Sequence, residues 1–136
     1  MDENSGNGGE VVDWIVFCAA RSELGAGFAR ILSYFREDGE KAVSRIEAAM
    51  HNRDTAGLVL PAHTMKSEAR QFGAEPLGAL AEEIEFTARR AIEIRAFPDE
   101  LIPAVARLRP LYLETMTQLE AEANPLTPIA RRLGFT

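Results

Sequence analysis

Apolar side chains recur every three or four positions from Glu10 onward, and no stretch shows the sustained alternation typical of a β-strand. This periodicity predicts an all-α protein. Gly73 is a typical helix terminator, and Asn52 and Asp54 are typical helix-capping residues. The five expected helices cover about 11–21, 27–50, 55–72, 75–96 and 98–119.

Three of these helices contain a residue that should distort them. The helix over 27–50 either bends at Asp38-Gly39 or splits there into two helices, and we favour one bent helix. Pro61 and Pro110 each remove one helical hydrogen bond, so we expect bends at both positions.

The expected helices are joined by short loops, and helices joined in this way pack antiparallel. The predicted architecture is an up-and-down antiparallel four-helix bundle, with the short N-terminal helix capping one end. The length of 136 residues fits one domain. We assign the bundle to 10–123, a disordered Gly- and Asn-rich lead-in to 1–9, and an irregular tail with two prolines to 124–136.

Charge and composition narrow the class of function. The net charge of −6 disfavours a nucleic-acid binder, which needs a basic face. One cysteine, Cys18, excludes an internal disulfide, and its apolar surroundings favour a buried thiol over a nucleophile. The N-terminus lacks a secretory signal, and no apolar run is long enough to span a membrane. We therefore expect a cytoplasmic protein, and a monomer, because a four-helix bundle closes its own core.

The helix over 55–72 carries a histidine, His63, opposite its apolar face. At about 100° per residue, His63 lies roughly 180° from the middle of the apolar stripe. A core histidine needs apolar neighbours on its own face, so we expect an exposed imidazole in mid-helix. The apolar stripe comprises Leu58, Ala62, Met65, Ala69 and Phe72.

The neighbours of His63 argue against a metal site. His51 is the only other histidine, and no cysteine or carboxylate lies three or four residues after His63. An exposed neutral imidazole is also a nucleophile that can carry a phosphoryl group. Lys66 would offset the phosphate charge, Ser67 is small enough to leave the ring accessible, and Arg70 extends a basic edge. Solvated helix faces often look similar, so the residues alone leave a plain surface histidine and a phosphate carrier equally open.

The segment AHTMKSEARQFGA resembles the signature of histidine-containing phosphotransfer (Hpt) domains, approximately A-H-x-L-K-G-x-A-x-x-x-G-A. The helices written FARILSYFREDGEKAVSRIEAAM and PLGALAEEIEFTARRA are similar to those that flank the signature in the family. The resemblance covers about 11–96, and it departs from the family at Ser67, where the usual residue is glycine. The matched positions are Ala62, His63, Met65, Lys66, Ala69, Gly73 and Ala74.

The resemblance implies an exposed-histidine helical bundle that takes part in a multistep phosphorelay. His63 would accept a phosphoryl group from an aspartate on the receiver domain of a hybrid sensor histidine kinase and pass it to the receiver domain of a response regulator. Lys66 would stabilise the phosphate charge. The bundle would bind no cofactor, would have no ATP site and no autokinase activity, and would use Mg²⁺ supplied by the receiver. Its expected docking residues are Tyr34, Val59, Ser67 and Arg70.

Three alternatives remain beside this hypothesis. The first is a non-catalytic helical module that binds a receiver domain or a partner helix. The second is a phosphotransfer segment excised from a larger kinase. The third is an acid–base enzyme, which only the cluster of Glu82, Glu83 and Glu85 suggests, and such a cluster on a helix typically forms a solvated face.

Overall fold

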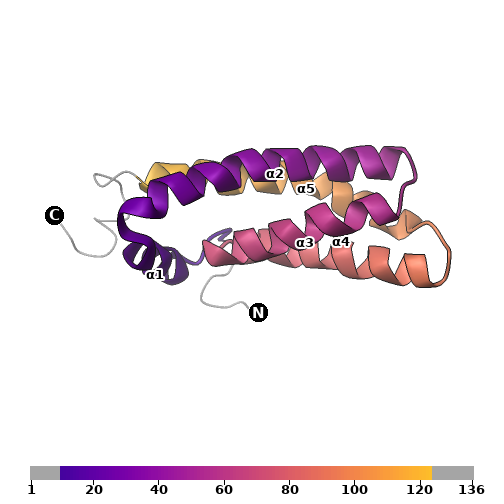
Figure 1. Cartoon of the computed structure of the whole chain (residues 1–136), viewed down its shortest axis with the longest axis horizontal. Helices are drawn as coiled ribbons and strands as arrows, with labels where there is room; N and C mark the ends of the chain where they lie inside the picture. Colours follow the sequence, from indigo (N-terminus) through magenta and orange to yellow (C-terminus); the bar gives the residue numbers. More distant parts are fainter. Residues whose placement is uncertain (1–9, 124–136) are drawn as a thin grey trace.

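The computed structural model describes residues 10–123, and α-helices form most of this part of the chain. Helices α2 to α5 lie side by side and alternate in direction, while α1 packs at one end of the bundle (Figure 1). The predicted all-α four-helix bundle with an N-terminal capping helix is therefore confirmed. The predicted lead-in at 1–9 and tail at 124–136 lie outside the described residues. The helices are α1 (Trp14–Leu24), α2 (Phe28–His51), α3 (Ala56–Gln71), α4 (Glu75–Glu93) and α5 (Ile102–Ala123), with 3₁₀ turns η1 (Gly25–Gly27) and η2 (Asp99–Leu101).

Helix α2 is one helix, as favoured from the sequence, and it continues through Gly39. This glycine is buried because the ring of Tyr112 on α5 lies against it, and a methyl group at Gly39 would collide with that ring. The Tyr112 hydroxyl donates a hydrogen bond to the Arg36 carbonyl oxygen at 2.6 Å. Gly39 thus permits close packing of α2 on α5 where the sequence suggested a bend.

Helix α1 begins later than the sequence predicted, at Trp14 rather than near residue 11. The Asp13 carboxylate caps it by accepting hydrogen bonds from the backbone N–H groups of Ile15 and Val16, at 3.0 and 3.4 Å. The two valines before Asp13, Val11 and Val12, are buried in the core without being helical. Their apolar character was therefore misread as the first turn of a helix.

The buried face of α3 agrees with the prediction. Its five stripe residues are each at most 1% exposed. Phe72 stacks on Phe35 of α2, with ring centroids 5.4 Å apart, and meets Phe28 edge to face at 5.8 Å. Because this aromatic contact fixes α3 about its axis, the opposite face of the helix, which carries His63, points away from the core.

A pair of carboxyl groups spans α2 and α3 at Asp38 and Glu68. Burial and the neighbouring Asp38 charge raise the pKa of Glu68 from 4.5 to about 7, and the two side chains share a hydrogen bond. The folded protein therefore keeps a proton that the unfolded chain loses between about pH 4.5 and 7. Stability should fall as the pH rises through this window, and the loss should be complete above the folded-state pKa.

We expect Glu68→Gln to remove this loss. The variant should match the wild type near pH 4 and exceed its free energy of unfolding at pH 8 by on the order of 1 kcal/mol, after discounting for water at this partly open site. Urea denaturation at pH 4, 6 and 8 measures the difference, with the exposed Glu37→Gln as the matched control. An equal pH slope in Glu68→Gln and wild type would contradict the assignment.

Candidate functional site

His63 lies in the middle of α3 with its side chain 49% exposed. Apolar contacts of α3 with the core occupy the other side of the helix, so the imidazole takes no part in core packing. The predicted exposure of His63 is confirmed, and it leaves one edge of the ring available to a partner.

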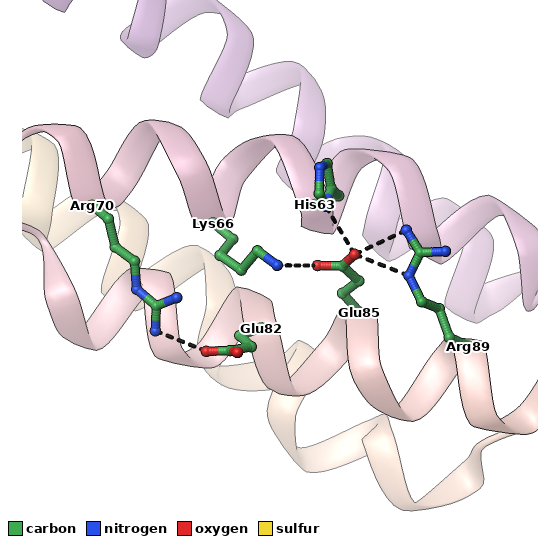
Figure 2. Close-up of polar contacts among 6 residues, drawn as sticks. All are labelled: His63, Lys66, Arg70, Glu82, Glu85 and Arg89. Atoms are coloured by element: carbon green, nitrogen blue, oxygen red, sulfur yellow. Dashed lines mark hydrogen bonds and ion pairs between the residues drawn. The ribbon is translucent and has the colours of Figure 1, made fainter.

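A buried carboxylate on α4 holds the other edge of the ring. Glu85 is only 8% exposed at its side chain, and its Oε2 atom lies 2.8 Å from His63 Nδ1 (Figure 2). Lys66 Nζ lies 2.8 Å from Glu85 Oε1. Arg89 donates from Nε at 3.0 Å and places Nη2 2.9 Å from Glu85 Oε2. One carboxylate thus gathers three basic side chains from α3 and α4.

The surroundings of Glu85 set its ionisation. Burial alone would raise the pKa of Glu85, but the hydrogen bonds from Lys66, His63 and Arg89 outweigh burial and lower it to about 2. Glu85 is therefore ionised at neutral pH, and an ionised carboxylate only accepts hydrogen bonds. The Nδ1 atom of a neutral His63 must then carry the ring proton, which leaves Nε2 with a free lone pair.

Sequence reasoning missed Glu85 and Arg89, and the interpretation of the glutamate cluster as a wholly solvated face was wrong for Glu85. Glu82 and Glu83 are exposed as expected, at 54% and 53% of their side chains. Glu85 lies on the helix wheel close to the buried Ala81 and Ala88, four residues before and three after it. Its position beside the apolar stripe of α4 is the signal that could have separated it from its neighbours.

The other predicted site residues differ in how close they come to His63. Lys66 lies one turn after His63, but its side chain is only 23% exposed because the ammonium group turns toward Glu85. Arg70 hydrogen-bonds Glu75 at 3.1 and 3.0 Å and Glu82 at 2.8 Å, so its charge is already paired.

The three remaining docking candidates lie outside the network around Glu85. Ser67 is exposed one turn after His63, and Val59 is half-buried one turn before it. Tyr34 is 51% exposed on α2, where it helps to line a hollow of about 260 Å³ between α2 and α3. The structure therefore joins Lys66 to His63 through Glu85, and places Tyr34 on the neighbouring helix.

No group of three or more His, Cys, Asp and Glu side chains in residues 10–123 could hold a metal ion. Nor is any helix in the same range long and apolar enough to cross a membrane.

The fold and the site together define a class: an antiparallel helical bundle that presents a single mid-helix imidazole, held from behind by a buried carboxylate. The model of the Hpt domain family matches residues 30–122 of the chain. The chain therefore belongs to the histidine-containing phosphotransfer domain family, as the sequence signature indicated, and this membership supports a histidine phosphotransfer role in a phosphorelay.

A solved structure agrees with the fold. The crystal structure of histidine-containing phosphotransfer protein B from Pseudomonas aeruginosa PAO1 superimposes with a TM-score of 0.71 at 21% sequence identity. The match covers 84% of this chain and 95% of that protein. No curated protein sequence matches the chain significantly.

Proposed function

We propose that this protein relays phosphoryl groups between receiver-domain aspartates through Nε2 of His63. The observation that carries the proposal is the hydrogen bond between His63 Nδ1 and the ionised Glu85, which leaves Nε2 as the nucleophilic nitrogen on an exposed imidazole. The donor would be the receiver domain of a hybrid sensor histidine kinase, and the acceptor the receiver domain of a response regulator.

The transfer requires little chemistry from the bundle itself. The Nε2 lone pair attacks the phosphorus of an aspartyl phosphate, the N–P bond forms, and the P–O bond to the aspartate breaks as the carboxylate leaves. Mg²⁺ held in the acidic pocket of the receiver would offset the charge on the phosphoryl oxygens. The contribution of the bundle is to position the ring and to supply a nearby cation at Lys66.

Docking would use the exposed faces of α2 and α3 around His63. Leu60 is 69% exposed three residues before the histidine, and it lines a hollow of about 140 Å³ together with Lys41 and Arg45 of α2. Tyr34 on α2 adds an exposed aromatic side chain to the exposed aliphatic side chain of Leu60 on α3. Such apolar side chains rimmed by charges are typical of a protein-binding surface.

The test is transfer of a labelled phosphoryl group. Each receiver domain of the source organism is phosphorylated on its aspartate with labelled acetyl phosphate and mixed with the protein. We expect at least one receiver to lose its label to the protein, in an acid-labile, alkali-stable form that mass spectrometry locates on His63. Label that stays on every receiver, or that reaches a residue other than His63, would refute the proposal.

The same mixtures test the alternative function, a non-catalytic module that binds a receiver domain or a partner helix. The exposed Leu60 and Tyr34 would serve such a module equally well. A receiver that forms a stable complex with the protein while keeping its label would favour the module.

Lys66 should affect the rate of transfer without being essential. Lys66→Met keeps an unbranched side chain only one atom shorter but removes the charge that pairs with Glu85. We therefore expect transfer at saturating receiver to slow by about 3- to 10-fold, equivalent to about 1 kcal/mol. Rapid-quench measurement of label transfer gives the rate. Arg107→Met, which removes a 60% exposed cation on α5 that pairs with Glu83, is the control and should leave the saturated rate unchanged. An unchanged rate in Lys66→Met would exclude Lys66 from the chemistry.

A further inference from the structure

We propose that Glu85 keeps the Nδ1 proton on His63 through the whole transfer cycle, so that phospho-His63 stays an imidazolium at neutral pH. The inference rests on the proposed function, and it makes Glu85 a positioning residue that acts through His63. Its consequence is that the phosphoryl group remains easy to pass on at pH values where an isolated phosphohistidine loses its ring proton.

The geometry fixes the carboxylate in the position that this role needs. Glu85 Oε2 faces His63 Nδ1 at 2.8 Å, and the side chain is 8% exposed, so water does not compete freely for the contact. Lys66 holds Oε1 and Arg89 holds Oε2 with two nitrogens. A carboxylate anchored at both oxygens cannot rotate away from the ring when the other edge of the ring is phosphorylated.

The proton matters most in the outward step. When His63 receives a phosphoryl group, Nε2 forms the N–P bond, the aspartate leaves, and the ring becomes a cation that still carries its Nδ1 proton. In the outward step the N–P bond electrons return to Nε2, and a protonated ring departs as neutral imidazole. A ring that had lost the Nδ1 proton would have to depart as imidazolate, a far poorer leaving group. With the proton retained, neither step exchanges a proton with solvent.

The charges around the ring act in both directions. Glu85 and the phosphoryl oxygens favour the imidazolium, because an opposite charge nearby stabilises the charged form. The ammonium of Lys66 and the guanidinium of Arg89 oppose it, although both are paired with Glu85. Helix α2 also brings charged groups to this side of α3. These are Asp38, Lys41 and Arg45, which line a hollow together with Thr64, the residue after His63. Among the described residues, Glu85 is the carboxylate bonded to His63, so its charge should dominate.

The matched variant is Glu85→Gln, whose amide oxygen still accepts the Nδ1 hydrogen bond but carries no charge. Both proteins are phosphorylated with potassium phosphoramidate, a small donor that needs no receiver. The pH at which Nδ1 loses its proton is then read from ¹⁵N chemical shifts of the His63 ring. The pH profile of phosphate release provides a second reading, because loss of this proton makes the N–P bond more stable.

We expect the midpoint of both profiles to lie at least about one pH unit higher in the wild type than in Glu85→Gln. A merely structural role for Glu85 would change rates without moving the midpoint, so equal midpoints would overturn the inference. If Glu85→Gln does not fold, the reference is a synthetic peptide of residues 56–71, phosphorylated in the same way, which lacks α4. A wild-type midpoint equal to that of the peptide would also overturn it.

The two proposals fail in different experiments. A shifted midpoint in a protein that takes no label from any receiver would refute the phosphorelay function and leave the role of Glu85 standing. If the protein accepts label from a receiver but the wild type and Glu85→Gln have the same midpoint, the phosphorelay function stands and the role of Glu85 is refuted.

Discussion

Replacing His63 with alanine is expected to abolish acceptance of a phosphoryl group from a phosphorylated receiver domain, with a loss of at least about a hundredfold in transferred label. In residues 10–123, His63 is the histidine whose Nδ1 atom contacts an ionised carboxylate, and this contact leaves the Nε2 lone pair free to attack phosphorus. The fold should survive the substitution, because the imidazole is half-exposed and contributes nothing to the core. Label on the protein after gel separation, and helicity by circular dichroism, measure the two effects.

The second histidine of the chain provides the matched control. His51 is exposed at the C-terminal end of α2, and no carboxylate of residues 10–123 contacts its ring. His51→Ala should therefore accept label at the wild-type rate. Equal labelling of His63→Ala and wild type, or a loss of label in His51→Ala alone, would show that His63 is not the phosphate carrier.

The helix ends show how far the sequence alone could predict the fold. Helices α2, α3 and α4 all end in the same way. The residue after the C-cap adopts a left-handed backbone conformation, and a hydrogen bond runs back from it to the last helical turn. These left-handed residues are Arg53, Gly73 and Arg95, with φ of 55°, 81° and 57°. Glycine adopts this conformation without strain, and arginine does not. The sequence therefore indicated the end of α3, where Gly73 follows, but carried no corresponding glycine at the ends of α2 and α4. At Arg95 the sequence carries no such signal, so α4 was predicted to run three residues too far.

The candidate site shows the same division between local and long-range information. His63 and its exposure follow from a helix wheel, because they depend only on the spacing of apolar residues within α3. The partner of His63 does not, since Glu85 is 22 positions away and reaches the ring only when α4 packs on α3. The sequence placed Lys66 near His63, but it did not predict the ion pair of Lys66 with Glu85, which also forms only when α4 packs on α3.

The close packing of α3 on α4 itself depends on small side chains. Arg70 crosses over Gly78 on its way to Glu75 and Glu82, and a Cβ atom at Gly78 would lie 2.8 Å from Arg70 Cγ. The small residues Ala81 and Ala88 are buried on either side of Glu85 along α4. This arrangement lets the short glutamate side chain span the gap to His63, which a bulkier interface would not allow.

Ser67 is the position where this chain departs from the family signature nearest the chemistry, and it gives the second large effect. Its side chain is exposed one turn after His63, on the face that a receiver domain would approach. Ser67→Leu places a branched side chain beside the imidazole, so we expect transfer from a phosphorylated receiver to slow at least about tenfold. Leucine is a good helix former, and the bundle should keep its stability at this exposed position.

A small donor separates blocked access from a damaged site. Phosphoramidate is far smaller than a receiver domain, so its rate of reaction with His63 should change less than about twofold in Ser67→Leu. Ser67→Gly, which restores the residue usual in the family, should transfer at least as fast as the wild type from the receiver. If Ser67→Leu lost reaction with both donors equally, the substitution would have disturbed the imidazole and Glu85 directly. If it lost neither, the receiver would not approach His63 over this face of α3, and the docking surface would have to lie toward α4 and Arg89.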